Sequence, residues 1–248
     1  MEFGKRKSSC KFSQCAVQPV VQKEVGQLKL VSVALVSAMK NVLFVLESLA
    51  VSEAWLRRDT LRQAPRNERD WQGDILRQTQ DDRLRGELSI EYNIYGPIKD
   101  KQYWEACEAQ IKKLPPNITV NYHGDIAPDK IAAALAASHV FILPSKSENF
   151  GHAIYEALSA GRPVITSNNT PWNKLEDAKA GMNVSLTDTA ELVQAIERFA
   201  GMGQEELEAW SKGARAYADS AVDVEGIRRQ YEEMFSPHHL PIDREDLT

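Results

Sequence analysis

Short apolar runs alternate along this chain with segments of helical periodicity, at intervals of about 20–30 residues. Alternation of this kind is typical of parallel strands joined by helical crossovers. The sequence therefore predicts an α/β fold, a single doubly wound parallel sheet with helices on both faces. The strands are expected at 28–36, 88–95, 118–122, 140–143 and 164–167. The helices are expected from 42 onward, at 102–114, at 128–137, from about 150, and at 189–200, 204–220 and 224–235.

The predicted domain spans 28–235, and the sequence on either side of it lacks sustained periodicity. Residues 1–27 are expected to form an N-terminal tail, and 236–248 a C-terminal tail. Residues 51–86 combine eight arginines with acids and glutamines, and strong apolar positions are sparse. We interpret this segment as a solvated insertion, partly helical or disordered. An arginine-rich surface for a polyanion is the alternative, and the interleaved acids argue against it.

Composition excludes several classes of protein. The net charge of −5 gives no sign of a nucleic-acid partner. Three cysteines are too few for a disulfide framework, and no Cys/His cluster predicts a metal site. The longest apolar run, at 28–36, is far shorter than the ~20 residues of a membrane span. We expect a cytoplasmic protein with no transmembrane segment and no cofactor.

The predicted strand at 140–143 leads through a polar loop into an amphipathic helix. The start of that helix offers unpaired N–H groups and a partial positive charge, which suit an anion. Gly151 has no side chain to block the approach of a phosphate. Glu148 and Glu156 lie eight residues apart and can accept hydrogen bonds from hydroxyl groups. This combination indicates a sugar-diphosphate site. Alternatively, Glu148 caps the helix and Glu156 is merely solvated.

The segment 147–165, SENFGHAIYEALSAGRPVI, closely resembles the signature of the donor domain of family 4 retaining glycosyltransferases. Residues 95–97 and 122–124 show weaker similarity, in the same order along the chain as in that family. The resemblance as a whole extends over 28–235, apart from the insertion. The resemblance implies the Rossmann-like, C-terminal half of a GT-B fold. It also implies a nucleotide sugar as the donor substrate of a hexosyl transfer.

The resemblance assigns a role to each matching residue. It implies that Glu156 binds the ribose hydroxyls and that Glu148 faces the transferred sugar. It also implies that the amides of Asn149, Phe150 and Gly151 form a cradle that binds the diphosphate. The base would lie near Ile126, in the turn 124–126.

The family also carries an arginine and, five residues later, a lysine, which stabilise charge on the leaving diphosphate. Lys40 matches the lysine, and Leu35 stands where the arginine is expected. A leucine cannot act as a bidentate phosphate clamp. The resemblance therefore predicts Glu148 and Lys40 as the catalytic residues, with one cation of the pair replaced.

Three further side chains carry smaller predictions. His152 borders the loop and could reach a phosphate, although an exposed histidine at a helix start is more often a bystander. His123 is predicted to be structural. Trp172 follows a strand and is predicted to pack in the core, with support of the site as the alternative.

Glycosyltransferases of this type bind the acceptor in an N-terminal domain, which residues 1–27 are too short to provide. We therefore expect a donor domain that is incomplete as a catalyst on its own. It would be either a subunit that works with a separate acceptor-domain protein, or a truncated product that binds nucleotide without transfer. The alternative from a different class is a non-catalytic α/β module that binds a phosphorylated ligand or a protein partner.

Overall fold

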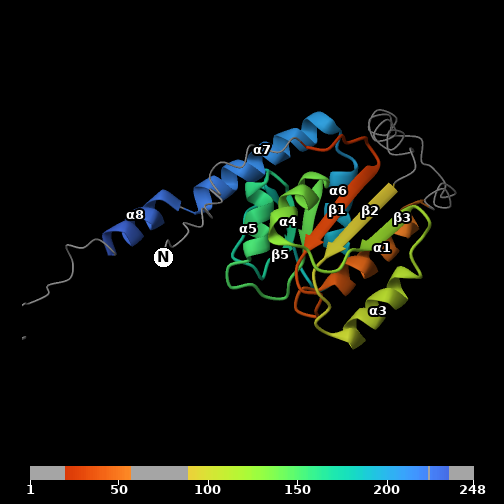
Figure 1. Cartoon of the computed structure of the whole chain (residues 1–248). Coiled ribbons are helices and arrows are strands. Elements are labelled where there is room, and N and C mark those ends of the chain that lie inside the picture. Colours follow the sequence, from red (N-terminus) through yellow and green to blue (C-terminus); the bar gives the residue numbers. More distant parts are fainter. Residues whose placement is uncertain (1–19, 57–88, 223, 235–248) are drawn as a thin grey trace, which may run out of the picture.

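The computed structural model describes residues 20–56, 89–222 and 224–234 (Figure 1). Most of the predicted N-terminal tail, residues 57–86 of the predicted insertion and the predicted C-terminal tail lie outside these residues. The description below is confined to the remainder.

Six parallel strands form one sheet in the order β3-β2-β1-β4-β5-β6. This confirms the predicted fold class. The strands are β1 Gln27–Val33, β2 Ser89–Tyr95, β3 Ile118–Tyr122, β4 Val140–Leu143, β5 Val164–Ser167 and β6 Gly181–Val184. The edge strand β6 is absent from our prediction because its sequence, GMNV, contains glycine and asparagine, which are depleted in strands.

Helices cover both faces of the sheet (Figure 1). They are α1 Val42–Leu56, α3 Lys101–Ile111, α4 Pro128–Ala136, α5 His152–Ser159, α6 Ala190–Ala200, α7 Gln204–Ala221 and α8 Val224–Met234. One apolar cluster unites the sheet with α1, α3 and α6, and a second unites it with α4, α5 and α7. Helix α8 extends away from these layers (Figure 1). The domain is thus a three-layer α/β/α sandwich.

The central strands are apolar on both sides because both of their faces are covered. In β4, Val140 and Ile142 belong to one apolar cluster, while Phe141 and Leu143 belong to the other. All four residues are buried. An uninterrupted apolar run, rather than an alternating one, is what a doubly covered parallel strand requires.

The first predicted strand ends three residues earlier than expected. Strand β1 stops at Val33, after which Ala34 N donates to Tyr95 O at 3.0 Å and Val36 N to Pro97 O at 3.0 Å. These bonds draw the chain beside the segment that follows β2, so residues 34–41 form a loop at the carboxyl edge. Helix α1, which follows this loop, continues to Leu56. Residues 51–56, which the sequence places in the insertion, therefore belong to α1.

A neutral histidine joins the N-terminal lead-in to the amino edge of the sheet. The side chain of His139 is 1% exposed, and its Nδ1 accepts from Lys29 N at 2.9 Å. Its Nε2 lies 3.1 Å from Gln22 O and donates to it, since a carbonyl can only accept. Burial, with further contributions from Lys23, Lys29 and Arg162, lowers the pKa of His139 to about 4.

This shift predicts a loss of stability in acid. Between the ordinary pKa of 6.5 and the folded value of about 4, the unfolded chain binds more protons at His139 than the folded one. Its contribution is therefore fully present above pH 6.5 and is lost as the pH falls toward 4, up to about 3 kcal/mol. Urea denaturation at pH 7 and pH 4.5 measures this loss.

The matched variant is His139→Asn, which keeps an acceptor for Lys29 N without a titrating ring. Its free energy of unfolding should change less between the two pH values than that of the wild type. Equal changes in the two proteins would assign the acid sensitivity to other groups.

Candidate functional site

A cavity of about 640 Å³ opens where the order of the strands reverses, at the carboxyl ends of β1 and β4. The chain leaves β1 toward α1 on one face and leaves β4 toward α5 on the other. The two loops therefore diverge, and this is the place where doubly wound sheets bind their ligands.

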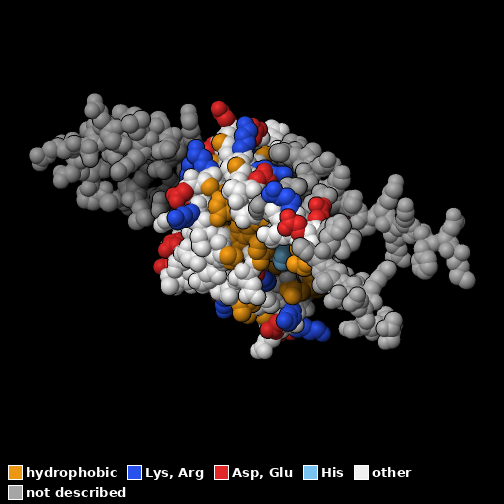
Figure 2. All heavy atoms as spheres, turned by 90° about the vertical axis from the view of Figure 1, so that its left-hand side faces the viewer, with side chains coloured by type: hydrophobic (Ala, Val, Ile, Leu, Met, Phe, Trp, Pro, Cys, Tyr) orange, Lys and Arg blue, Asp and Glu red, His pale blue; other side chains and the backbone are white. Residues whose placement is uncertain are grey.

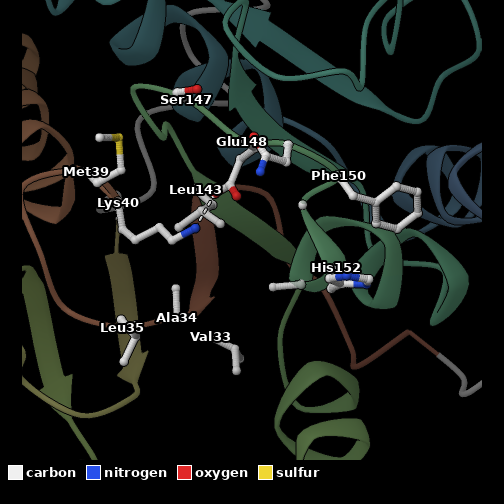
Figure 3. A pocket seen from close by; sticks show the side chains of 13 residues that line it. Val33, Ala34, Leu35, Met39, Lys40, Leu143, Ser147, Glu148, Phe150 and His152 are labelled. Carbon is white, nitrogen blue, oxygen red and sulfur yellow. Dashed lines mark hydrogen bonds and ion pairs between the residues drawn. The ribbon is translucent and has the colours of Figure 1, made fainter.

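Two segments that are far apart in the sequence line this cavity. Residues 33–35, 39 and 40 come from the end of β1 and its loop, while Leu143 and residues 147–153 come from β4 and the start of α5 (Figure 3). Lys146 N donates to Met39 O at 2.8 Å and ties the two loops together. The walls of the cavity thus hold each other in place.

Side chains from β5 fix the loop that follows β4. Thr166 Oγ1 donates to Leu143 O at 2.8 Å, and Ser167 Oγ donates to Ser145 O at 2.5 Å. Both hydroxyls are buried, where an unpaired carbonyl would be costly. The backbone of the loop is therefore held from the neighbouring strand, which leaves its far side free to face the cavity.

An ion pair crosses the cavity between the two predicted catalytic residues. Lys40 Nζ lies 2.5 Å from Glu148 Oε1, and Ser145 Oγ donates to the same oxygen at 2.7 Å (Figure 3). The side chains of Lys40 and Glu148 are 24% and 10% exposed. Sequence reasoning selected both residues but did not anticipate the ion pair, or Ser145 as its third member.

The remaining lining residues contribute little charge. Lys40 is the one lysine or arginine among the residues that line the cavity, all of them in the described part of the chain. Leu35 and Met39 lie on its rim with 45% and 50% of their surface exposed. The position at which the resemblance predicts an arginine is therefore apolar and lies on the rim of the cavity.

The start of α5 contributes backbone donors. Ile154 N and Tyr155 N both donate to Gly151 O, whereas within the described structure the amides of His152 and Ala153 have no backbone acceptor. Both of these residues line the cavity. Asn149, Phe150 and Gly151 also line it, so the predicted cradle faces the predicted site. The partial positive charge of a helix N-terminus is directed into the cavity.

Gly151 is required by the backbone as well as by the space around it. Its φ of 78° and ψ of 58° are left-handed. A Cβ atom there would lie 3.1 Å from Trp172 Nε1 and 3.2 Å from Ile154 Cδ1. The turn that ends at Gly151 is therefore both left-handed and tightly packed.

Trp172 does more than pack. It is 4% exposed, its indole Nε1 donates to Phe150 O, and its ring lies edge-on to Phe150 with centroids 5.3 Å apart. The indole thus holds the predicted cradle from behind. Trp172 belongs to the apolar cluster with α4, α5 and α7, as predicted, and its contacts with Phe150 also fit the alternative, support of the site.

Two of the predicted binding residues lie outside the lining of the cavity. Glu156 is half-buried on α5, one turn beyond His152, which does line the cavity. Burial raises the pKa of Glu156, and the nearby His152 opposes this shift. Ile126 follows β3, an edge strand separated from β1 by β2. The proposed roles of both residues stay predictions.

His123, predicted to be structural, lies beside the turn that precedes Ile126. Its ring stacks on Tyr95 with centroids 4.4 Å apart and an interplanar angle of 10°. Its Nε2 lies 2.8 Å from Asn93 Oδ1, and Gly96 N donates to Gly124 O at 2.7 Å. These contacts join the loops after β2 and β3.

Other kinds of site find little support in the described residues. None of their helices is long and apolar enough to cross a membrane. No group of three or more His, Cys, Asp or Glu side chains among them is placed to hold a metal ion. On the face of the described structure that Figure 2 shows, positive and negative side chains lie beside one another instead of forming one basic patch.

The conformation at Gly151 makes a testable prediction. Gly151→Ala should lower the free energy of unfolding by about 1–3 kcal/mol, because alanine is strained at this φ and its Cβ presses on Trp172. Gly203→Ala is the matched control, since Gly203 also precedes a helix but has φ −84°, and a Cβ there would meet Val25 Cγ2 at 3.9 Å, an ordinary contact. Equal losses in the two variants, measured by urea denaturation, would contradict this account.

Solved structures resemble this fold at low sequence identity. The Anabaena protein Alr3699/HepE, in complex with UDP and glucose, is 19% identical with a TM-score of 0.60, covering 85% of this chain and 48% of its own. WaaG, a glycosyltransferase involved in lipopolysaccharide biosynthesis, is 19% identical with a TM-score of 0.57, covering 86% and 48%. The catalytic domain of the Helicobacter pylori cholesterol-α-glucosyltransferase is 13% identical with a TM-score of 0.56, covering 79% and 99%. The fold thus matches one half of a GT-B glycosyltransferase.

Sequence comparison agrees with this likeness. The sulfoquinovosyl transferase SQD2 of Arabidopsis thaliana is 34% identical over 70 residues, which cover 28% of this chain and 13% of the relative. The chain spans about half the length of the first two solved structures. Residues 68–201, more than half of the 248, match the family described as Glycosyl transferases group 1. This chain therefore belongs to the group 1 glycosyl transferases.

Proposed function

We propose that this domain binds a nucleotide-activated sugar and serves as the donor-binding half of a retaining hexosyltransferase of family 4. The observation that carries the proposal is the cavity between β1 and β4, which combines an open helix N-terminus with Lys40 and Glu148. Neighbours of the same fold support it, since HepE is described in complex with UDP-glucose and TarM of S. aureus in complex with UDP.

In the proposed function, each part of a nucleotide sugar would contact residues that line the cavity or lie beyond its lining. The diphosphate would accept hydrogen bonds from the amides at 149–153 and from Lys40. Glu148 would accept from the hydroxyls of the sugar, and Glu156, one turn beyond His152, from those of the ribose. The base would extend toward the turn at Ile126, beyond β2.

The same groups would act on the transition state. Breaking the bond between sugar and phosphate leaves charge on the departing diphosphate, and preorganised donors that face this charge lower the barrier. Lys40 and the start of α5 are placed to do so, whereas Leu35 supplies no charge.

Transfer also requires an acceptor held opposite the donor. We propose that a second domain, on this or a separate chain, provides that surface. Positioning two reactants is worth ~7–11 kcal/mol, so the donor-binding domain without such a surface would at most hydrolyse its ligand slowly. The second candidate function is a non-catalytic module that binds a phosphorylated ligand. The apolar Leu35 favours it, because binding tolerates the loss of a cation better than catalysis does.

Glu156→Ala tests the proposed ribose contact. Calorimetric titration with UDP-, GDP- and ADP-sugars should show binding weakened by ~1–3 kcal/mol, from the loss of charge-assisted hydrogen bonds. Glu205→Ala is the control, because Glu205 is exposed in the first turn of α7. Equal effects of the two variants would make Glu156 an ordinary surface carboxylate.

Leu35→Arg tests whether the diphosphate binds beside Lys40 and position 35. An arginine at this rim position should bind the diphosphate beside Lys40 and tighten nucleotide-sugar binding by about 1–2 kcal/mol. Leu35→Gln, of similar length but neutral, should leave the affinity nearly unchanged. If arginine and glutamine behaved alike in the titration, the diphosphate would lie elsewhere.

A further inference from the structure

Glu148 places a negative charge beside Lys40, the one lysine or arginine that lines the cavity. Its Oε1 lies 2.5 Å from Lys40 Nζ and also accepts from Ser145 Oγ, and its side chain is 10% exposed. A phosphate that binds Lys40 must therefore come close to a largely buried carboxylate. Two like charges at such a distance repel strongly where water is partly excluded.

Lys40 is the one lysine or arginine in the cavity that can balance both of these anions. Leu35 lies on the rim of the cavity with 45% of its surface exposed, and the remaining positive charge comes from the start of α5 and from any protonated His152. Three N–H donors on Lys40 allow contact with both a carboxylate and a phosphate, but they supply only a single positive charge. A ligand that carries less negative charge on its terminal phosphate therefore meets less repulsion.

From this geometry we propose that Glu148 selects the conjugated nucleotide sugar against the free nucleoside diphosphate. The inference deepens the proposed function and rests on it. Conjugation removes negative charge from the terminal phosphate and adds sugar hydroxyls that donate to Glu148. The free diphosphate keeps its charge and offers no such donors, so the carboxylate opposes it. This is selection by a repulsive element, which favours the donor over the product that transfer would release.

Isothermal titration with UDP, GDP, ADP and their glucose conjugates tests the proposal. The measured quantity is the ratio of the Kd of each free diphosphate to the Kd of its conjugate. Glu148→Gln keeps the size of the side chain and removes its charge. We expect this ratio to fall about tenfold or more, with the free diphosphate binding several-fold more tightly than to the wild type. Glu105→Gln, which removes an exposed charge on α3, should leave the ratio unchanged.

A second pair of variants separates competition for Lys40 from a structural role. Lys40→Met should weaken binding of the free diphosphate more in the Glu148→Gln background than in the wild type, because the neutral glutamine leaves the ammonium to the ligand. Thermal melts followed by circular dichroism check that every variant folds. A Glu148 that only shaped the loop would change both affinities in parallel and leave the Lys40 effect equal in both backgrounds.

The outcomes are distinguishable. An unchanged ratio in Glu148→Gln, with conjugates still binding to the wild type, overturns this inference and leaves the proposed function standing. If the wild type binds none of the conjugates, the proposed function is wrong, and the inferred selectivity of Glu148 is then wrong as well.

Discussion

The parallel pairing of β1 with β4 is the constraint on which the rest of the site depends. It places Leu30 beside Val140 and Val31 beside Phe141, although more than a hundred residues separate the two strands. Because the chain leaves these strands toward opposite faces of the sheet, a cavity remains between their loops, even though Lys146 N and Met39 O join them. The cavity is thus a consequence of strand order, and the Lys40–Glu148 pair follows from it.

The rigidity of this cavity comes from elements that do not line it. Hydroxyls of β5 hold the carbonyls that follow β4, and the indole of Trp172 holds Phe150 O. Trp172 is fixed in turn, since Asn183 of β6 donates to its carbonyl at 2.8 Å. Charged groups that stabilise a reaction must be held in place before it begins, because moving them costs part of the stabilisation. The two strands beyond β4 therefore support the site from outside.

The sequence predicts the parts of this arrangement that are local. Continuous apolar runs such as 140–143 identify the central strands, and a glycine at the start of an amphipathic helix predicts an anion site, which stays a prediction. Strand β6 has no such signal, because edge position and pairing to β5, rather than residue type, make it a strand. The contact of Lys40 with Glu148 spans 108 positions and follows from strand order, which residue patterns leave open. The hydrogen bond from Ser145 to Glu148 likewise becomes apparent only from the structure.

The apolar rim separates what this site can bind from what it can catalyse. In the proposed function, ground-state binding of a diphosphate would draw on backbone donors at the start of α5 and on Lys40, and both groups line the cavity. Catalysis draws on charge that appears only as the bond breaks, and removing one donor at such a position costs ~3–4 kcal/mol of transition-state stabilisation. Under the proposed function, Leu35 would therefore affect the rate far more than the affinity. Glu148 would act in the same direction, because its charge would take up part of the positive charge that Lys40 offers to a leaving diphosphate.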